Sequence, residues 1–290
     1  MIFRKKILVF FIVCVFLYLS APCCTSSVKY RMAKDSYDQG ISLKNMARDQ
    51  QSIAFFRRTI SFLKSDDAKG TLVPEGRLLL GNCYLYLGDY ENARMQYWQI
   101  ININEPETSS SDLQGFALLG LGDIYEQEGY VDAAREFYEI VLSNSSVRTR
   151  ESYPEAAIRW ADVMLRAADE DRNQDNPKEF EKKVSTIIKK LTDMVHQFPS
   201  HANLRRALGN TYYIKSEGTN TEDLNQALTH VLIALEIPSN PIILQRILIN
   251  DFNIISENLL QAITDPLQQE EFRKKFFELS NRWNIETGRH

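Results

Sequence analysis

Two stretches of the chain carry one pattern: PEGRLLLGNCYLYLGDYENARMQYWQIININEPE at residues 74–107 and GFALLGLGDIYEQEGYVDAAREFYEIVLSNSSVR at residues 115–148. In each, a tyrosine follows the glycine of a Leu-Gly pair by three residues, a second glycine follows it by seven, and an alanine by twelve. The matching positions are Gly81 and Gly122, Tyr84 and Tyr125, Gly88 and Gly129, and Ala93 and Ala134. This spacing is typical of one helix face, a turn, and the face of a second helix.

The small residues predict how each pair of helices packs. Gly81 and Ala93, like Gly122 and Ala134, are expected where two antiparallel helices approach closely. Gly88 and Gly129 are expected in the turns, because a positive φ costs glycine little. At these residues the chain resembles the tetratricopeptide repeat (TPR), a unit of about 34 residues. The resemblance implies an all-α, right-handed α-solenoid in which the first helix of each pair lines a concave, partner-binding groove.

Weaker versions of the pattern occur on both sides of these stretches. We predict a TPR solenoid over residues 31–238 and a closing pair of capping helices over residues 240–284. Its repeats are expected at residues 31–64, 74–107, 115–148, 154–199 and 202–238. Residues 104–112 are expected to form a loop, and residues 169–177 and 216–222 to form enlarged turns. The acidic run in the first of these turns lacks the ligand spacing and central glycine of an EF-hand, which favours a solvated loop.

The N-terminus has the composition of an export signal. Arg4, Lys5 and Lys6 precede an apolar run over residues 7–19, and Ser20-Ala21-Pro22-Cys23-Cys24 follows. This ending is similar to a lipobox, so we expect lipidation at Cys23 or Cys24. An uncleaved membrane helix over residues 7–24 is the alternative. In both cases residues 1–24 are a signal or anchor, residues 25–30 a tether, and the rest is exported and membrane-anchored on the periplasmic or outer side of a bacterial envelope.

Charge and composition argue against several function classes. The net charge is −4, which disfavours nucleic-acid binding because phosphates require a basic face. Cys83 is the one cysteine of the body and is expected to fill the core. The four histidines are not paired at metal-ligand spacing, and no phosphate loop or nucleophile motif occurs. We therefore expect no enzymatic activity, no cofactor and no metal.

The expected groove is defined by register within the first helices. The residue after the small residue of each repeat is Asn82, Asp123, Asp162 or Asn210. These side chains are either simply solvated or form a row that hydrogen-bonds a partner's extended backbone. Tyr86, Phe116, Arg166, Arg206 and Tyr213 are expected around them. Arg206 and Asn210 also have the spacing of part of the carboxylate clamp found in some TPR domains, without its other members. Asp123 and Asp162 disfavour an acidic peptide.

Two functions fit this sequence. The first is a membrane-anchored TPR scaffold that binds a protein or peptide partner in its groove as part of a cell-envelope assembly. The second is a periplasmic accessory protein that encloses a small hydrophobic ligand for a transporter, which predicts a dry, apolar cavity. The polar row favours the first function.

Overall fold

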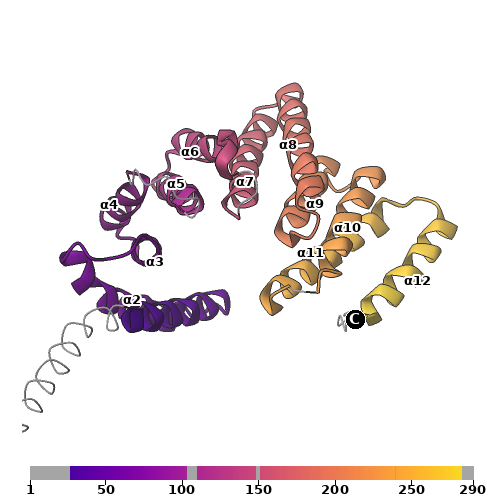
Figure 1. Cartoon of the computed structure of the whole chain (residues 1–290). Coiled ribbons are helices and arrows are strands. Elements are labelled where there is room, and N and C mark those ends of the chain that lie inside the picture. The colour runs from indigo at the N-terminus through magenta and orange to yellow at the C-terminus, as the bar shows by residue number, and fades with distance from the viewer. Residues whose placement is uncertain (1–26, 103–109, 148–150, 239, 283–290) are drawn as a thin grey trace, which may run out of the picture. The chain divides into compact units, whose positions relative to one another are not determined.

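The computed structural model describes residues 27–102, 110–147, 151–238 and 240–282, and every regular element in these ranges is a helix (Figure 1). The chain divides into two compact units, residues 1–128 and residues 129–290. In each unit successive helices pack as antiparallel hairpins, as in a TPR-like solenoid. The predicted all-α fold class is therefore confirmed.

Unit 1 contains two and a half hairpins. They are formed by a helix over residues 27–45, α2 (Asp49–Ala68), α3 (Pro74–Tyr86), α4 (Tyr90–Ile101) and α5 (Ser110–Gln127). Pro74 is the first residue of α3, where its missing N–H costs nothing, and the Asp89 side chain accepts the Asn92 N–H to start α4. Because α3 packs against α2, α4 and α5, it lies at the centre of the unit.

Unit 2 contains α6 (Val131–Ser143), η1 (Ser145–Val147), α7 (Ser152–Asn173), α8 (Pro177–Gln197), α9 (Ala202–Ser216), α10 (Thr221–Leu235), α11 (Ile242–Ala262) and α12 (Pro266–Arg282). The pairs α7–α8 and α9–α10 form hairpins, and α7 also packs on α9. α11 packs against α10, and Phe252 of α11 stacks on Phe276 of α12 with ring centroids 5.3 Å apart.

The two turn glycines behave as predicted, with φ of +75° at Gly88 and +86° at Gly129. Gly81 lies at a contact between α3 and α4 as predicted, but the contact is made by a side chain of α4. A Cβ on Gly81 would lie 2.5 Å from Cε1 of Tyr97, and a Cβ on Gly120 would lie 2.4 Å from Cζ of the same ring. The small residues of α3 and α5 therefore make room for a fully buried tyrosine from α4.

The expected close approach does occur in unit 2. A Cβ on Gly209 of α9 would lie 3.1 Å from the backbone oxygen of Ala227 on α10. Ala227 is fully buried in the core that α10 and α11 share. Gly122 and Ala134 belong to different units.

Three predicted loop or tether segments are shorter than expected because their residues extend helices. Residues 27–30 are helical, where Lys29 pairs with Asp66 at 3.1 Å and ties this turn to α2. Residues 110–112 belong to α5. Residues 169–173 are the last turn of α7, which is stabilised by a 2.7 Å ion pair between Arg172 and Asp169 and a 2.6 Å ion pair between Lys183 and Asp171.

The turn expected at residues 216–222 is also shorter, covering residues 217–220. Glu217 and Gly218 have φ of +49° and +74°. The Asn220 side chain accepts the N–H groups of Glu222 and Asp223 and so places both in the first turn of α10.

The predictions for residues 1–24, including Cys23 and Cys24, lie outside the described residues. Among the described helices, none is both long enough and apolar enough to cross a membrane.

Candidate functional site

The aromatic ring of Tyr86 is the centre of the candidate site in unit 1. It lies at the C-terminal end of α3 and stacks on Phe56 of α2, with ring centroids 4.9 Å apart and planes at 17°. The ammonium of Lys44 lies 4.1 Å from the centroid of the Tyr86 ring, in cation–π geometry. Tyr86 is held by these contacts and still 37% exposed, so its ring is both positioned and accessible.

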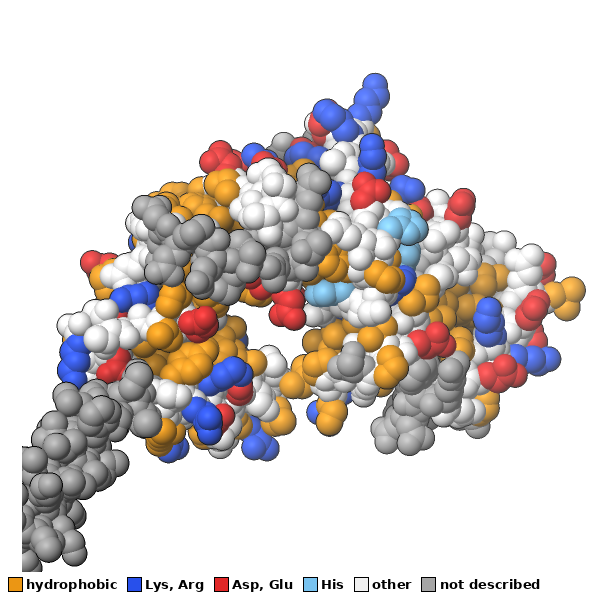
Figure 2. All heavy atoms as spheres, viewed as in Figure 1, with side chains coloured by type: hydrophobic (Ala, Val, Ile, Leu, Met, Phe, Trp, Pro, Cys, Tyr) orange, Lys and Arg blue, Asp and Glu red, His pale blue; other side chains and the backbone are white. Residues whose placement is uncertain are grey.

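A pocket of about 450 Å³ opens beside this ring. We call it the Tyr86 pocket. Its walls come from the end of α3, the following turn, the start of α4, the last turns of α5 and the helix over residues 27–45. The lining residues are Lys44, Leu85, Tyr86, Leu87, Gly88, Tyr90, Asp123, Glu126 and Gln127. Tyr86 and Asp123, two of the predicted groove residues, thus share one pocket. On the face shown in Figure 2, apolar side chains gather over the α2–α3 part of this unit.

The Asn82 amide, predicted to face a partner, is bonded inside unit 1. Its Oδ1 accepts the Tyr97 hydroxyl at 2.8 Å, and its Nδ2 donates to the Tyr37 hydroxyl at 3.2 Å. Burial, helped by the nearby Asp123 carboxylate, raises the pKa of the Tyr97 hydroxyl well above its ordinary value. Burial also raises the pKa of Tyr37. Asn82 therefore joins three helices inside unit 1.

Phe116 lies half-buried on α5 and is not one of the residues that line the Tyr86 pocket. Cys83, the neighbour of Asn82, is fully buried, and burial raises its pKa to about 12. Its predicted role as core filler is confirmed.

Five predicted site residues belong to unit 2, and the structure separates them into two places. Asp162 and Arg166 are exposed one helical turn apart on α7, where the Arg166 Nε donates to the Asp162 backbone oxygen at 3.4 Å. Asn210 and Tyr213 of α9 line a small pocket of about 100 Å³ with residues of α10 and α11. The Tyr213 hydroxyl there accepts the Asn258 amide at 3.1 Å.

Arg206 of the predicted clamp has a partner inside unit 2. The Arg206 Nε lies 2.6 Å from Oδ2 of Asp251 on α11, and this ion pair links two helices. The clamp of Arg206 and Asn210 stays a prediction.

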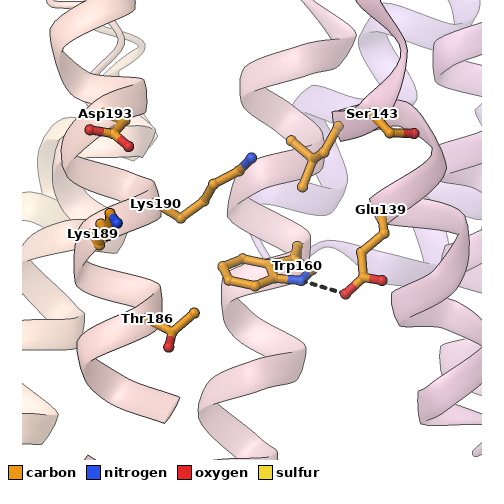
Figure 3. A pocket seen from close by; sticks show the side chains of 8 residues that line it. Glu139, Ser143, Trp160, Thr186, Lys189, Lys190 and Asp193 are labelled. Atoms are coloured by element: carbon orange, nitrogen blue, oxygen red, sulfur yellow. Dashed lines mark hydrogen bonds between the residues drawn. The ribbon is translucent and has the colours of Figure 1, made fainter. Parts of the chain in front are cut away.

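The sequence argument missed a second pocket, of about 380 Å³, formed by α6, α7 and α8 (Figure 3). Its floor is Trp160, whose position in the sequence indicates only an apolar helix face, and the Trp160 indole N–H donates to Glu139 Oε1 at 3.1 Å. The available signal was the Lys189-Lys190 pair in the amphipathic second helix of that repeat. The two lysines indicate a pocket only once the structure shows that α6 forms the wall opposite α8. In the described ranges no group of three or more His, Cys, Asp or Glu side chains could hold a metal ion.

Comparison with known proteins agrees with the hairpin geometry. The model of the tetratricopeptide repeat family matches residues 74–106 and 117–145. These stretches coincide with the two glycine-marked repeats.

Several solved structures are similar to this chain. A thermophilic TPR protein of Thermus thermophilus is 15% identical, with 76% of this chain and 99% of that protein covered and a TM-score of 0.44. BtubC from P. vanneervenii is 17% identical, with 85% and 94% covered and a TM-score of 0.42. YrrB, described as a TPR protein with an unusual peptide-binding site, is 14% identical, with 73% and 89% covered and a TM-score of 0.35. No curated protein sequence gives a significant match.

Proposed function

We propose that this TPR protein is a non-enzymatic scaffold that binds a segment of a protein partner in the Tyr86 pocket. The observation that carries the proposal is the Tyr86 ring, which Phe56 and Lys44 hold in place while more than a third of it remains exposed. Pre-positioned, partly exposed aromatic side chains are the usual anchors of protein interfaces, because little side-chain entropy is lost when they are covered.

The charges around the Tyr86 pocket indicate which segment fits. Asp123 and Glu126 bring two carboxylates to the lining, against the single ammonium of Lys44. An acidic segment would therefore meet repulsion, whereas an apolar side chain flanked by neutral or basic residues would not. The alternative of a small hydrophobic ligand fits less well, since three charged side chains would have to be desolvated around it.

Site-specific photocrosslinking in intact cells tests this function. A photoreactive residue at Gln127, which lines the Tyr86 pocket, is compared with one at Arg57, which is exposed on α2 outside the pocket. We expect one protein to be captured from Gln127 and not from Arg57. The Tyr86→Ala variant should reduce this capture at least about tenfold, because loss of an aromatic hot-spot anchor costs about 2 kcal/mol or more.

The matched control for this loss is Trp98→Ala, which removes an aromatic side chain that is 42% exposed on α4 outside the pocket. It should leave capture unchanged. Equal capture from both crosslinker positions, or capture that Tyr86→Ala leaves intact, would show that the pocket does not hold the partner.

We further propose that the scaffold is exported and anchored in a bacterial envelope through Cys23 or Cys24. The support is the order of basic residues, apolar run and small residues before the two cysteines. Cells fed a labelled fatty acid should incorporate the label into the wild-type chain and into one of the variants Cys23→Ser and Cys24→Ser. Membrane-associated protein that carries no label would instead favour an uncleaved helix over residues 7–24.

A further inference from the structure

The groove above Trp160 is built to receive a side chain. Its two walls are α6 and α8, and its floor is α7 (Figure 3). The apolar side chains of the lining are Trp160 on α7 and Leu142 on α6. Trp160 is 7% exposed, and its indole N–H is already bonded to Glu139. An incoming group therefore meets the ring of Trp160 and needs to offer no hydrogen-bond acceptor to it.

This groove is separate from the first-helix face of the repeat. Asp162 lies two residues after Trp160 on α7, and at about 100° per residue the two side chains point about 200° apart. Asp162 is exposed on one side of α7, while Trp160 faces α8 and α6. A partner in the Trp160 groove would thus occupy the side of the repeat formed by the second helices.

The charges of the groove are carried by α8. Lys182 and Lys183 of this helix have carboxylate partners, at 3.2 Å from Glu179 and 2.6 Å from Asp171. Lys189 and Lys190, which line the groove, form no ion pair or side-chain hydrogen bond with any residue in the part of the chain that the structure describes. Figure 3 shows the Lys190 side chain extending across the groove above Trp160.

The nearby carboxylates do not supply this missing partner. Glu139 accepts the Trp160 N–H and lies 3.8 Å from Arg135 on its own helix. Asp193 stands exposed one turn further along α8. The helix as a whole carries five lysines and three carboxylates in a chain whose net charge is −4, and basic side chains gather over it in Figure 2. The groove thus places two lysines that form no ion pair with any described residue over an apolar floor, with one carboxylate bonded to the Trp160 indole and one exposed carboxylate at its edge.

We propose that the Trp160 groove binds a protein segment in which an apolar side chain stands next to a carboxylate. The apolar side chain covers Trp160 and Leu142, and the carboxylate pairs with Lys190 and Lys189. Charge complementarity selects this occupant, because Lys189 and Lys190 form no ion pair with the described residues, whereas Glu139 is already bonded to the Trp160 indole. The site is independent of the Tyr86 pocket, whose carboxylates favour the opposite charge.

The test uses the full chain labelled with 5-fluorotryptophan. The three tryptophans give three fluorine resonances, and Trp160→Phe identifies one of them. The probe is the peptide acetyl-Asp-Asp-Leu-Phe-Asp-amide. We expect it to shift the Trp160 resonance in a saturable manner. Acetyl-Lys-Lys-Leu-Phe-Lys-amide and acetyl-Asp-Asp-Ser-Ser-Asp-amide should each bind at least about tenfold more weakly, because one lacks the charge and the other the apolar side chain.

Two pairs of charge reversals on α8 separate the groove from general electrostatics. K189E/K190E should weaken binding of the acidic peptide about tenfold or more, since two exposed ion pairs together reach roughly that factor. K178E/K182E, which changes the net charge equally but outside the groove, should change it less than about threefold. Thr186→Trp, which fills the groove from an exposed position on α8, should abolish binding.

Three results would overturn the proposal: an unmoved Trp160 resonance, equal binding of the acidic and basic peptides, or a K189E/K190E variant that binds like the wild type. Far-UV circular dichroism and a thermal unfolding curve report whether each variant is folded. Because the Tyr86 pocket is in unit 1 and is unchanged in these variants, failure here leaves the photocrosslinking result at Gln127 unaffected.

Discussion

The polar contacts of the Tyr97 ring give a sharp prediction about stability. The ring is fully buried and fills the space that Gly81 and Gly120 leave open. Its hydroxyl donates to Asn82 Oδ1 at 2.8 Å. Tyr97→Phe keeps the ring and its packing and removes one oxygen. The change therefore isolates the hydrogen bond from the packing of α3, α4 and α5.

The expected loss follows from what remains after the oxygen is removed. A typical hydrogen bond contributes about 0.5–1.5 kcal/mol, and an acceptor left without a partner inside the protein costs about 1–3 kcal/mol. The Asn82 amide is half-buried and keeps its second bond, to Tyr37. We therefore expect Tyr97→Phe to lower the free energy of unfolding by about 1–2 kcal/mol.

A double-mutant cycle with Asn82→Leu measures the pair directly. Asn82→Leu also takes a donor from the Tyr37 hydroxyl, but this loss is the same with either residue at position 97 and cancels in the cycle. Because the double variant no longer has an Asn82 oxygen without its donor, it should be more stable than the sum of the single losses by about 1 kcal/mol. Urea unfolding followed by circular dichroism, with hydrogen exchange of α3 and α4 amides as a local probe, gives the energies. A Tyr97→Phe variant within about 0.3 kcal/mol of the wild type, or strictly additive losses, would refute the buried network.

Three further predictions concern single residues. Gly209→Val should destabilise unit 2 by about 1–3 kcal/mol in thermal unfolding, because its Cβ would press on the Ala227 backbone oxygen, and an unchanged melting temperature would contradict this close approach. Cys83 should react with thiol reagents only after unfolding, since burial raises its pKa to about 12, and fast labelling of the native protein would disprove its burial. Burial, and then the Arg205 charge, lower the pKa of His230 to about 4. As the pH falls from about 6.5 to about 4, the unfolded chain therefore takes up a proton that the folded protein does not, and the free energy of unfolding should decrease. His230→Gln should flatten this part of the stability curve, and an unaltered slope would count against the prediction.

The hairpins could be predicted from the sequence because their signal is local. Gly88 and Gly129 mark turns through their own backbone conformation, and the spacing of small and aromatic residues gives the helical face. The identity of the packing partner is not local. A glycine in a helix indicates that a neighbouring group packs closely against it. In α3 this group is the Tyr97 ring of α4, and the sequence does not show which residue of α4 packs there.

The same distinction applies at the candidate site. Asn82 and Asp123 occupy equivalent repeat positions. This spacing does not show whether the Asn82 amide is solvated or bonded to residues of other helices, here Tyr37 and Tyr97. Arg206 likewise looked available because Asp251 lies two helices further along the chain. Polar periodicity placed Tyr86 and Asp123 on one face, and the two residues line one pocket, but periodicity could not determine which polar groups are already paired.

Charge shows most clearly why whole-chain averages are insufficient for a repeat protein. A net charge of −4 argues against nucleic-acid binding, but it does not indicate whether a given surface prefers an acidic or a basic peptide. The Tyr86 pocket brings Asp123 and Glu126 beside an aromatic ring, whereas α8 brings Lys189 and Lys190 beside another. Each repeat contributes its own few side chains to a local field that solvent and salt screen within about 8–10 Å. A repeat scaffold can therefore carry surfaces of opposite preference, and reversing charge on α8 should alter the Trp160 groove alone.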